Sequence, residues 1–138
     1  GEGGEKRGNE SYGYTDASKV EQFIDETKID FLAVAIGNAH GRYKASPKLN
    51  FDLLKKINAI SGIPLVLHGA SGLTDLDIAK AIDNGIAKIN FFTELDEQFR
   101  EGFMSSSSEG NYMMFACREG QNRMKQRVKE ILSLCMRR

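Results

Sequence analysis

Two histidines are the side chains of this 138-residue sequence best suited to binding a metal ion. His40 and His68 each follow an apolar run, and each directly precedes a glycine. If the two runs are neighbouring parallel strands, about 4.8 Å apart, both imidazoles lie at the same sheet edge. Neutral imidazole binds zinc at about 2.0 to 2.1 Å, and a catalytic zinc takes three protein ligands and keeps one position open. A shared ion would need a third ligand; otherwise each histidine is a polar loop residue or a general base.

The turn Gly69-Ala70-Ser71-Gly72 is a candidate for binding phosphate. Small residues let backbone N–H groups approach an anion, the serine hydroxyl adds a donor, and a predicted helix follows with its positive end toward the turn. An ordinary glycine-rich turn between strand and helix is the alternative. Asn90 and Thr93 place further polar donors after the next predicted strand. Lys44 could reach the same anion, or it is a solvated surface lysine.

Alternating apolar periods predict the elements that must position these residues. Continuous or short apolar runs predict strands, and the first of them, over 31–36, is typical of a strand buried on both faces. Thr74 and Asp77 form a capping box that opens one predicted helix. The serine-rich stretch 105–110 is predicted to be a flexible loop, and the basic residues of the last helix to form a solvated face. The predicted strands are 31–36, 65–67 and 86–90, and the predicted helices are 15–27, 49–60, 74–84, 93–104 and 112–134.

The strands recur at the spacing of βα units, so right-handed crossovers make them parallel neighbours. A doubly wound open sheet and a segment of a (β/α)₈ barrel both fit this alternation, and three strands complete neither. In both architectures, binding sites form beyond the carboxyl ends of the strands. The two histidines and the glycine-rich turn occupy that position.

Composition excludes several other classes of protein. Hydrophobic residues make up 41% of the chain, enough for a folded core, and 19 basic residues balance 19 acidic ones, so no basic patch indicates nucleic acid. No apolar run approaches the length of a membrane helix. Cys117 and Cys135 lie in one predicted helix, which excludes a disulfide framework and favours a reducing, cytoplasmic location. Residues 1–13 are rich in glycine and are predicted to form a mobile loop.

Three segments of the sequence resemble a known family in order and spacing. They are Ala35-Ile36-Gly37-Asn38-Ala39-His40-Gly41-Arg42-Tyr43-Lys44, Pro64-Leu65-Val66-Leu67-His68-Gly69-Ala70-Ser71-Gly72 and Lys88-Ile89-Asn90-Phe91-Phe92-Thr93-Glu94-Leu95. They resemble the last three strands of the class II, metal-dependent fructose- and tagatose-bisphosphate aldolases. The resemblance extends from about Tyr14 to the C-terminus.

The resemblance implies a (β/α)₈ TIM barrel, of which residues 14–138 supply about the last three strands and the C-terminal helices. It implies a lyase of carbohydrate metabolism and glycolysis that uses zinc to cleave a ketose 1,6-bisphosphate reversibly into dihydroxyacetone phosphate and glyceraldehyde 3-phosphate. His40 and His68 would be two of three zinc ligands. A monovalent cation, sodium or potassium, would lie near Gly41, Gly69 and Ser71. The residues implied to bind the substrate phosphate are Gly41, Lys44, Gly69, Ser71, Asn90 and Thr93.

The family pattern also implies what this sequence lacks. Its first zinc histidine and its catalytic aspartate belong to an earlier strand, so the isolated 138-residue chain is expected to be inactive. The glycine-rich start resembles the mobile loop after the fifth strand, which makes Glu5 a candidate for proton transfer. Phe92 stands at a position linked to sugar preference, leaving fructose and tagatose bisphosphates open. The family forms dimers or tetramers, and the alternative function is an inactive, phosphate-binding relative that acts as a regulatory or interaction subunit.

Overall fold

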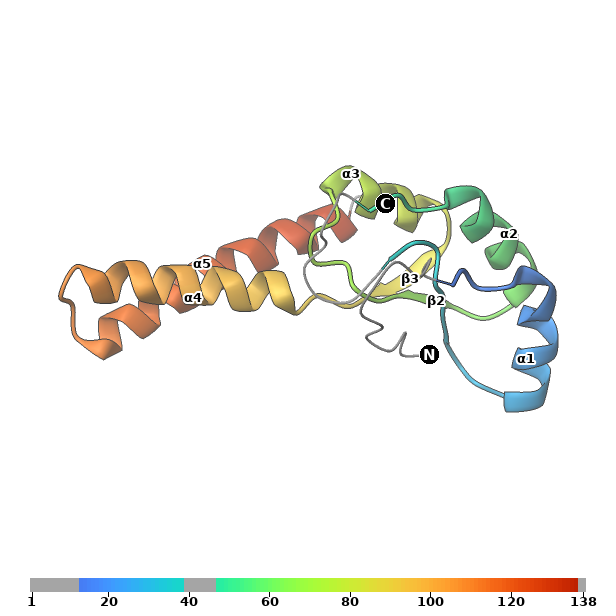
Figure 1. Cartoon of the computed structure of the whole chain (residues 1–138), viewed down its shortest axis with the longest axis horizontal. Helices are drawn as coiled ribbons and strands as arrows, with labels where there is room; N and C mark the ends of the chain where they lie inside the picture. The colour runs from blue at the N-terminus through green and yellow to red at the C-terminus, as the bar shows by residue number, and fades with distance from the viewer. Residues whose placement is uncertain (1–12, 39–46, 137–138) are drawn as a thin grey trace. The chain divides into compact units, whose positions relative to one another are not determined.

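The structure, a computed structural model, describes residues 13–38 and 47–136. Its elements fall into two units, residues 1–90 and 91–138, which are described separately below. The first unit contains a parallel sheet with the strand order β1-β2-β3, where β1 is Leu32–Ala33, β2 is Leu65–Leu67 and β3 is Ile86–Ile89 (Figure 1). The prediction of neighbouring parallel strands is therefore confirmed.

Three α-helices accompany this sheet. They are α1 (Val20–Thr27), which follows a short 3₁₀ helix over Ala17–Lys19, α2 (Phe51–Ser61) and α3 (Asp75–Asp83). Helix α2 contacts both α1 and α3, so the helices form a row along the sheet (Figure 1). This order of strands and helices is that of successive βα units, as the apolar periods predict.

Polar side chains cap the start of the 3₁₀ helix, of α2 and of α3. Asp16 accepts hydrogen bonds from the hydroxyl and the N–H of Ser18, and these bonds lower the pKa of its carboxyl group. Asn50 accepts from the N–H of Leu53 at 2.9 Å. Thr74 accepts from the N–H of Asp77 at 3.1 Å and donates its hydroxyl to the Asp77 carboxylate at 2.7 Å. The predicted cap by Thr74 is confirmed, with the Asp77 carboxylate bonded to the Thr74 hydroxyl.

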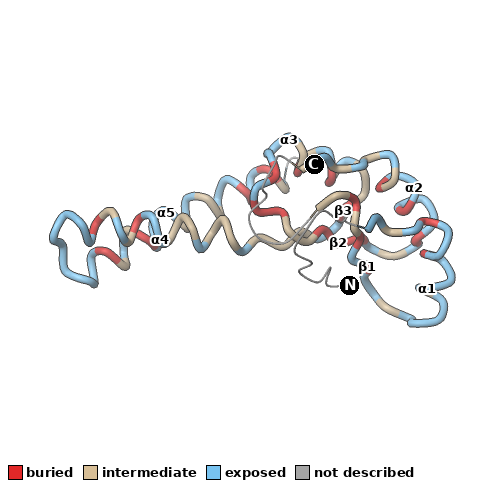
Figure 2. The backbone as a smooth tube through the Cα atoms, viewed as in Figure 1, coloured by how far each residue is buried: buried red, intermediate tan, exposed pale blue. Residues whose placement is uncertain are grey.

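The core of the first unit draws on every strand region and on α2 and α3. The largest fully buried side chains there are Ile36, Leu54, Ile57, Leu65, Leu67, Ile78 and Ile86 (Figure 2). All three residues of β2 are buried, because β2 pairs with a strand on each side. Burial of apolar surface on this scale is what holds the strand ends in register.

The first strand is shorter than its apolar run predicts. Strand pairing covers only two residues, and burial alternates from exposed Phe31 through Leu32 and Ala33 to buried Val34. The expectation of a strand buried on both faces is therefore wrong for the described chain. The reason is that only the face of β1 that carries Leu32 and Val34 is covered, whereas the face that carries Phe31 and Ala33 is exposed.

The second unit is a pair of helices, α4 (Thr93–Ser108) and α5 (Met113–Cys135), joined by a short turn (Figure 1). The predicted loop over the serine run is wrong, because α4 continues through Ser108. Ser106 is buried, and its hydroxyl and carbonyl oxygens both lie within hydrogen-bond distance of the Asn111 amide. Ser108 donates its hydroxyl to the Ser105 carbonyl at 2.8 Å. These bonds satisfy the serines within the helix and its turn.

Small residues let α4 and α5 approach closely. A Cβ added to Gly102 would come within 2.9 Å of the Gly120 Cα, and one added to Gly120 would come within 2.6 Å of the Phe99 carbonyl oxygen. Gly102, Ser106, Ala116 and Gly120 are all buried at this contact (Figure 2). Within the described residues, neither helix of this pair, nor any other helix, is long and apolar enough to cross a membrane.

Candidate functional site

The parallel ladder between β2 and β3 places Asn90 beside His68. Val66 pairs with Lys88 and Leu67 with Ile89, after an irregularity that leaves Ala87 as an extra residue on β3. The ladder continues past both strands, because the Asn90 N–H donates to the Leu67 carbonyl at 3.0 Å. Such a bulge re-aims the side chains that follow it. His68 and Asn90 therefore meet at the carboxyl ends of adjacent strands, where α/β sites form.

A chain of three polar side chains runs across this edge. The Asn90 amide nitrogen lies 3.1 Å from His68 Nδ1 and 3.4 Å from His68 Nε2, so it faces the ring edge that carries both nitrogens. The Lys88 ammonium group donates a hydrogen bond to the Asn90 amide oxygen. Because the lysine engages the oxygen, the NH₂ group of the amide is turned toward the imidazole. Lys88 thus sets the orientation of Asn90.

Asn38 ties the end of β1 to the end of β2. Its amide oxygen accepts from the Ile36 N–H at 2.8 Å, and its amide nitrogen donates to the His68 carbonyl at 3.0 Å. The preceding Gly37 has φ of +108°, and a Cβ there would lie 2.5 Å from the Lys48 carbonyl oxygen, so the position requires glycine. The sequence alone predicts no role for Asn38 or for Lys88. For Lys88 the available indication is its spacing of two residues from Asn90, which places both side chains on the same face of one strand.

Residues 69–73, directly after His68, form a tight turn. Gly69 and Gly72 have φ of +66° and +94°, and the Leu73 N–H donates to the Ala70 carbonyl at 3.0 Å. Ser71 is buried, with 8% of its surface exposed. Asp75 and Asp77 stand in the first turn of α3, and Thr74 already occupies the Asp77 N–H. The predicted attraction of an anion by the N-terminus of α3 is therefore weakened, because Thr74 occupies the Asp77 N–H group and two carboxylates stand in the first turn. Phosphate binding by the turn over residues 69–72 stays a prediction.

Four of the predicted site residues, His68, Gly69, Ser71 and Asn90, are described residues of the first unit and lie at or just beyond the ends of β2 and β3. Thr93 opens α4 in the second unit, where it is partly exposed. Phe92, which precedes it, has 78% of its surface exposed. The other predicted site residues, Glu5, His40, Gly41 and Lys44, lie outside the described residues.

The chemistry of His68 fits one ligand position of a zinc site. Its imidazole is partly exposed at a strand end, and its ring edge faces the Asn90 amide. The Asn90 N–H group and a metal ion would compete for the lone pair of one ring nitrogen, so metal binding requires the other ring nitrogen or a shift of Asn90. No group of three or more His, Cys, Asp or Glu residues suited to a metal occurs in the segments 13–38 and 47–136. The remaining ligands would therefore come from residues beyond those segments.

Comparison with known proteins identifies close relatives of this chain. A sequence model of the family Fructose-bisphosphate aldolase class-II matches residues 1–138. The uncharacterized protein YdjI of Escherichia coli strain K12 is 54% identical over 84 residues, which is 61% of this chain and 30% of YdjI.

Two solved structures share the fold of this chain. The crystal structure of the YdjI aldolase from Escherichia coli K12 superposes with a TM-score of 0.83 and 41% identity, covering 91% of this chain and 47% of that one. A proposed fructose-1,6-bisphosphate aldolase from Coccidioides immitis gives a TM-score of 0.81 and 29% identity, covering 91% of this chain and 44% of that one. The chain spans less than half the length of these relatives.

Proposed function

This chain belongs to the class II fructose-bisphosphate aldolase family, and we propose that it supplies part of the active site of a zinc-dependent ketose-1,6-bisphosphate aldolase. In the full-length protein the chain would form the last three strands and the C-terminal helices of a (β/α)₈ barrel. The observation that carries the proposal is the meeting of His68 and Asn90 at the carboxyl ends of β2 and β3, in a chain that matches the family throughout. Barrel enzymes build their active sites at this end of the strands.

The proposed reaction is the reversible cleavage of fructose or tagatose 1,6-bisphosphate into dihydroxyacetone phosphate and glyceraldehyde 3-phosphate. His68 and His40 would hold the zinc ion together with a third histidine outside this chain. When bound, zinc supplies Lewis-acid polarisation of the ketone carbonyl. The main catalytic aspartate would also come from outside this chain, with Glu5 as the candidate for assisting proton transfer.

The described residues would act by binding and orienting the substrate. Gly69 and Gly72 have positive φ angles, a turn conformation in which backbone N–H groups can bind a phosphate. The Asn90 amide, whose oxygen is held by Lys88, would present its NH₂ group to the same space. Gly41, Lys44, Ser71 and Thr93 would complete the phosphate site, and a sodium or potassium ion near Gly41, Gly69 and Ser71 would balance its charge. Fixing the phosphate fixes the reacting carbon atoms.

The proposed enzyme is a homo-oligomer. The start of α5 supports this, because Tyr112, Met113 and Met114 have 81%, 73% and 67% of their surfaces exposed. Exposed apolar groups of this size favour burial against another molecule. Size-exclusion chromatography with light scattering of the full-length protein tests it, and a monomer at micromolar concentration would contradict it.

The experiment that tests the proposed function is an aldol cleavage assay of the zinc-loaded, full-length protein with both ketose bisphosphates. We expect cleavage of at least one sugar, and a Ser71→Ala variant with weaker binding of the phosphorylated substrate. Binding of the bisphosphate without cleavage would instead identify an inactive regulatory relative. Absence of both binding and cleavage would contradict the proposal.

A further inference from the structure

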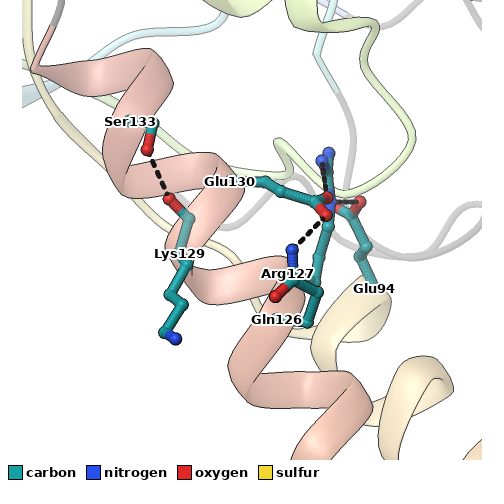
Figure 3. A network of polar contacts seen from close by, with 6 residues as sticks. All are labelled: Glu94, Gln126, Arg127, Lys129, Glu130 and Ser133. Carbon is teal, nitrogen blue, oxygen red and sulfur yellow. Dashed lines mark hydrogen bonds and ion pairs between the residues drawn. The ribbon is translucent and has the colours of Figure 1, made fainter.

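Arg127 departs from the solvated basic face predicted for α5. Its side chain is only 19% exposed, and its Nε donates to Glu94 Oε1 at 2.5 Å, across 33 residues of sequence (Figure 3). Its Nη1 also donates to Glu130 Oε2 at 3.1 Å. Arg123 on the same helix differs, because it pairs with Glu119 one turn away at 3.4 Å and both side chains are more than 40% exposed. Arg127 therefore links two helices through its ion pair, whereas the Arg123 ion pair stays within α5.

Glu94, the partner of Arg127, lies next to a residue of the proposed phosphate site. Glu94 is the second residue of α4 and directly follows Thr93, the residue proposed to bind phosphate. The Glu94 side chain is 23% exposed, so little water screens its charge. An unpaired carboxylate next to Thr93 would repel a phosphate dianion. The guanidinium of Arg127 neutralises that carboxylate and holds it on α5.

The pairing of α4 with α5 does not depend on this ion pair. Gly102 and Gly120 bring the two helix backbones into direct contact about two turns away from it along each helix, and Ser106 and Ala116 extend the buried contact toward the turn. Loss of Arg127 therefore leaves the helices packed. It frees the Glu94 carboxylate and the first turn of α4, which carries Thr93.

We propose that Arg127 is a positioning residue for phosphate binding, acting through Glu94 to neutralise and hold the first turn of α4. This inference rests on the proposed function, because the phosphate and the role of Thr93 come from it. Arg127 itself is not a catalytic residue. It acts on the affinity for the phosphorylated substrate and leaves the chemical step alone.

The test measures inorganic phosphate binding by calorimetry, and KM and kcat for the ketose bisphosphate, in the full-length protein. Arg127→Gln leaves Glu94 with an unpaired charge, and we expect phosphate to bind about tenfold more weakly and KM to rise about tenfold, with kcat within about twofold. Arg123→Gln is the matched control on the same helix and should leave both constants unchanged. Adding Glu94→Gln to Arg127→Gln removes the repelling charge and should restore phosphate affinity to within about threefold.

Three results would overturn the inference. One is an Arg127→Gln variant that binds phosphate as tightly as the unchanged protein. Another is a double variant as weak as the single one, because that would exclude neutralisation of Glu94 as the cause. A loss of kcat with unchanged phosphate affinity would place Arg127 in a different role. If the unchanged protein binds no phosphate at all, the proposed function itself fails, so the two failures are distinguishable.

Discussion

At the scale of single residues, Asn90 is the centre of the described site. Its backbone continues the β2–β3 ladder, its amide nitrogen faces the His68 ring, and its amide oxygen accepts from Lys88. The motif predicts that Asn90 and His68 belong to one site. It does not predict the part of Lys88, because a lysine near a strand end has many possible partners. The contact follows from register, which depends on the bulge at Ala87 and is not visible in local sequence.

Removing the ammonium group that orients Asn90 tests this role of Lys88. We expect Lys88→Met to raise KM for the ketose bisphosphate by roughly three- to tenfold, because the Asn90 amide loses a charge-assisted hydrogen bond on an exposed side chain. The zinc content should not change. Lys55→Met, at an exposed position on α2, is the control. Steady-state kinetics of the full-length variants measure the effect, and equal KM values would contradict it.

At the scale of elements, the sequence predicts which helices and strands form better than it predicts where each one ends. The capping box at Thr74 and the apolar stripe of α2 are sufficient to predict both helices, and Leu54 and Ile57 of that stripe are fully buried. The serine run fails as a loop signal because tertiary packing overrides weak helix propensity: Ser106 is buried against α5 and bonded to Asn111. The first strand is shorter than its apolar run, since pairing with β2 covers only Leu32 and Ala33.

The Thr74 cap stabilises α3, the helix that follows the turn over residues 69–72. Thr74→Ala removes the oxygen that accepts from the Asp77 N–H, and we expect it to lower the free energy of unfolding by about 1 kcal/mol. Thr74→Ser keeps the hydroxyl and should restore most of that loss. Chemical denaturation of the full-length protein measures both variants. A loss as large for serine as for alanine would show that the methyl group, not the cap, is responsible.

Close contact between α4 and α5 predicts a second effect on stability. Gly120→Ala would place a Cβ 2.6 Å from the Phe99 carbonyl oxygen, a backbone atom that cannot move aside by itself. We expect a loss of about 1 to 3 kcal/mol from overpacking. Gly13→Ala is the control, because nothing lies within 4 Å of the added Cβ and no positive φ is required there. Equal stabilities of the two variants, measured by denaturation, would argue against the tight helix contact.

At the scale of the whole molecule, the chain spans less than half the length of its solved relatives. It covers 47% of the YdjI aldolase structure and 44% of the Coccidioides immitis one. Three parallel strands and the pattern of histidines and glycines are enough to predict the family, because their order and spacing are specific. The proposed zinc site cannot be completed from this sequence, because it contains only two histidines. One of them, His40, lies outside the described residues.

In the proposed function, His68 binds a zinc ion on which aldol cleavage depends. Elemental analysis of the full-length protein and its His68→Ala variant tests it most directly, with cleavage of both ketose bisphosphates followed on the same samples. We predict one zinc ion per protomer in the unchanged protein, and loss of the zinc together with cleavage in the variant. A His68→Ala protein that retains its zinc and cleaves at the unchanged rate would contradict it.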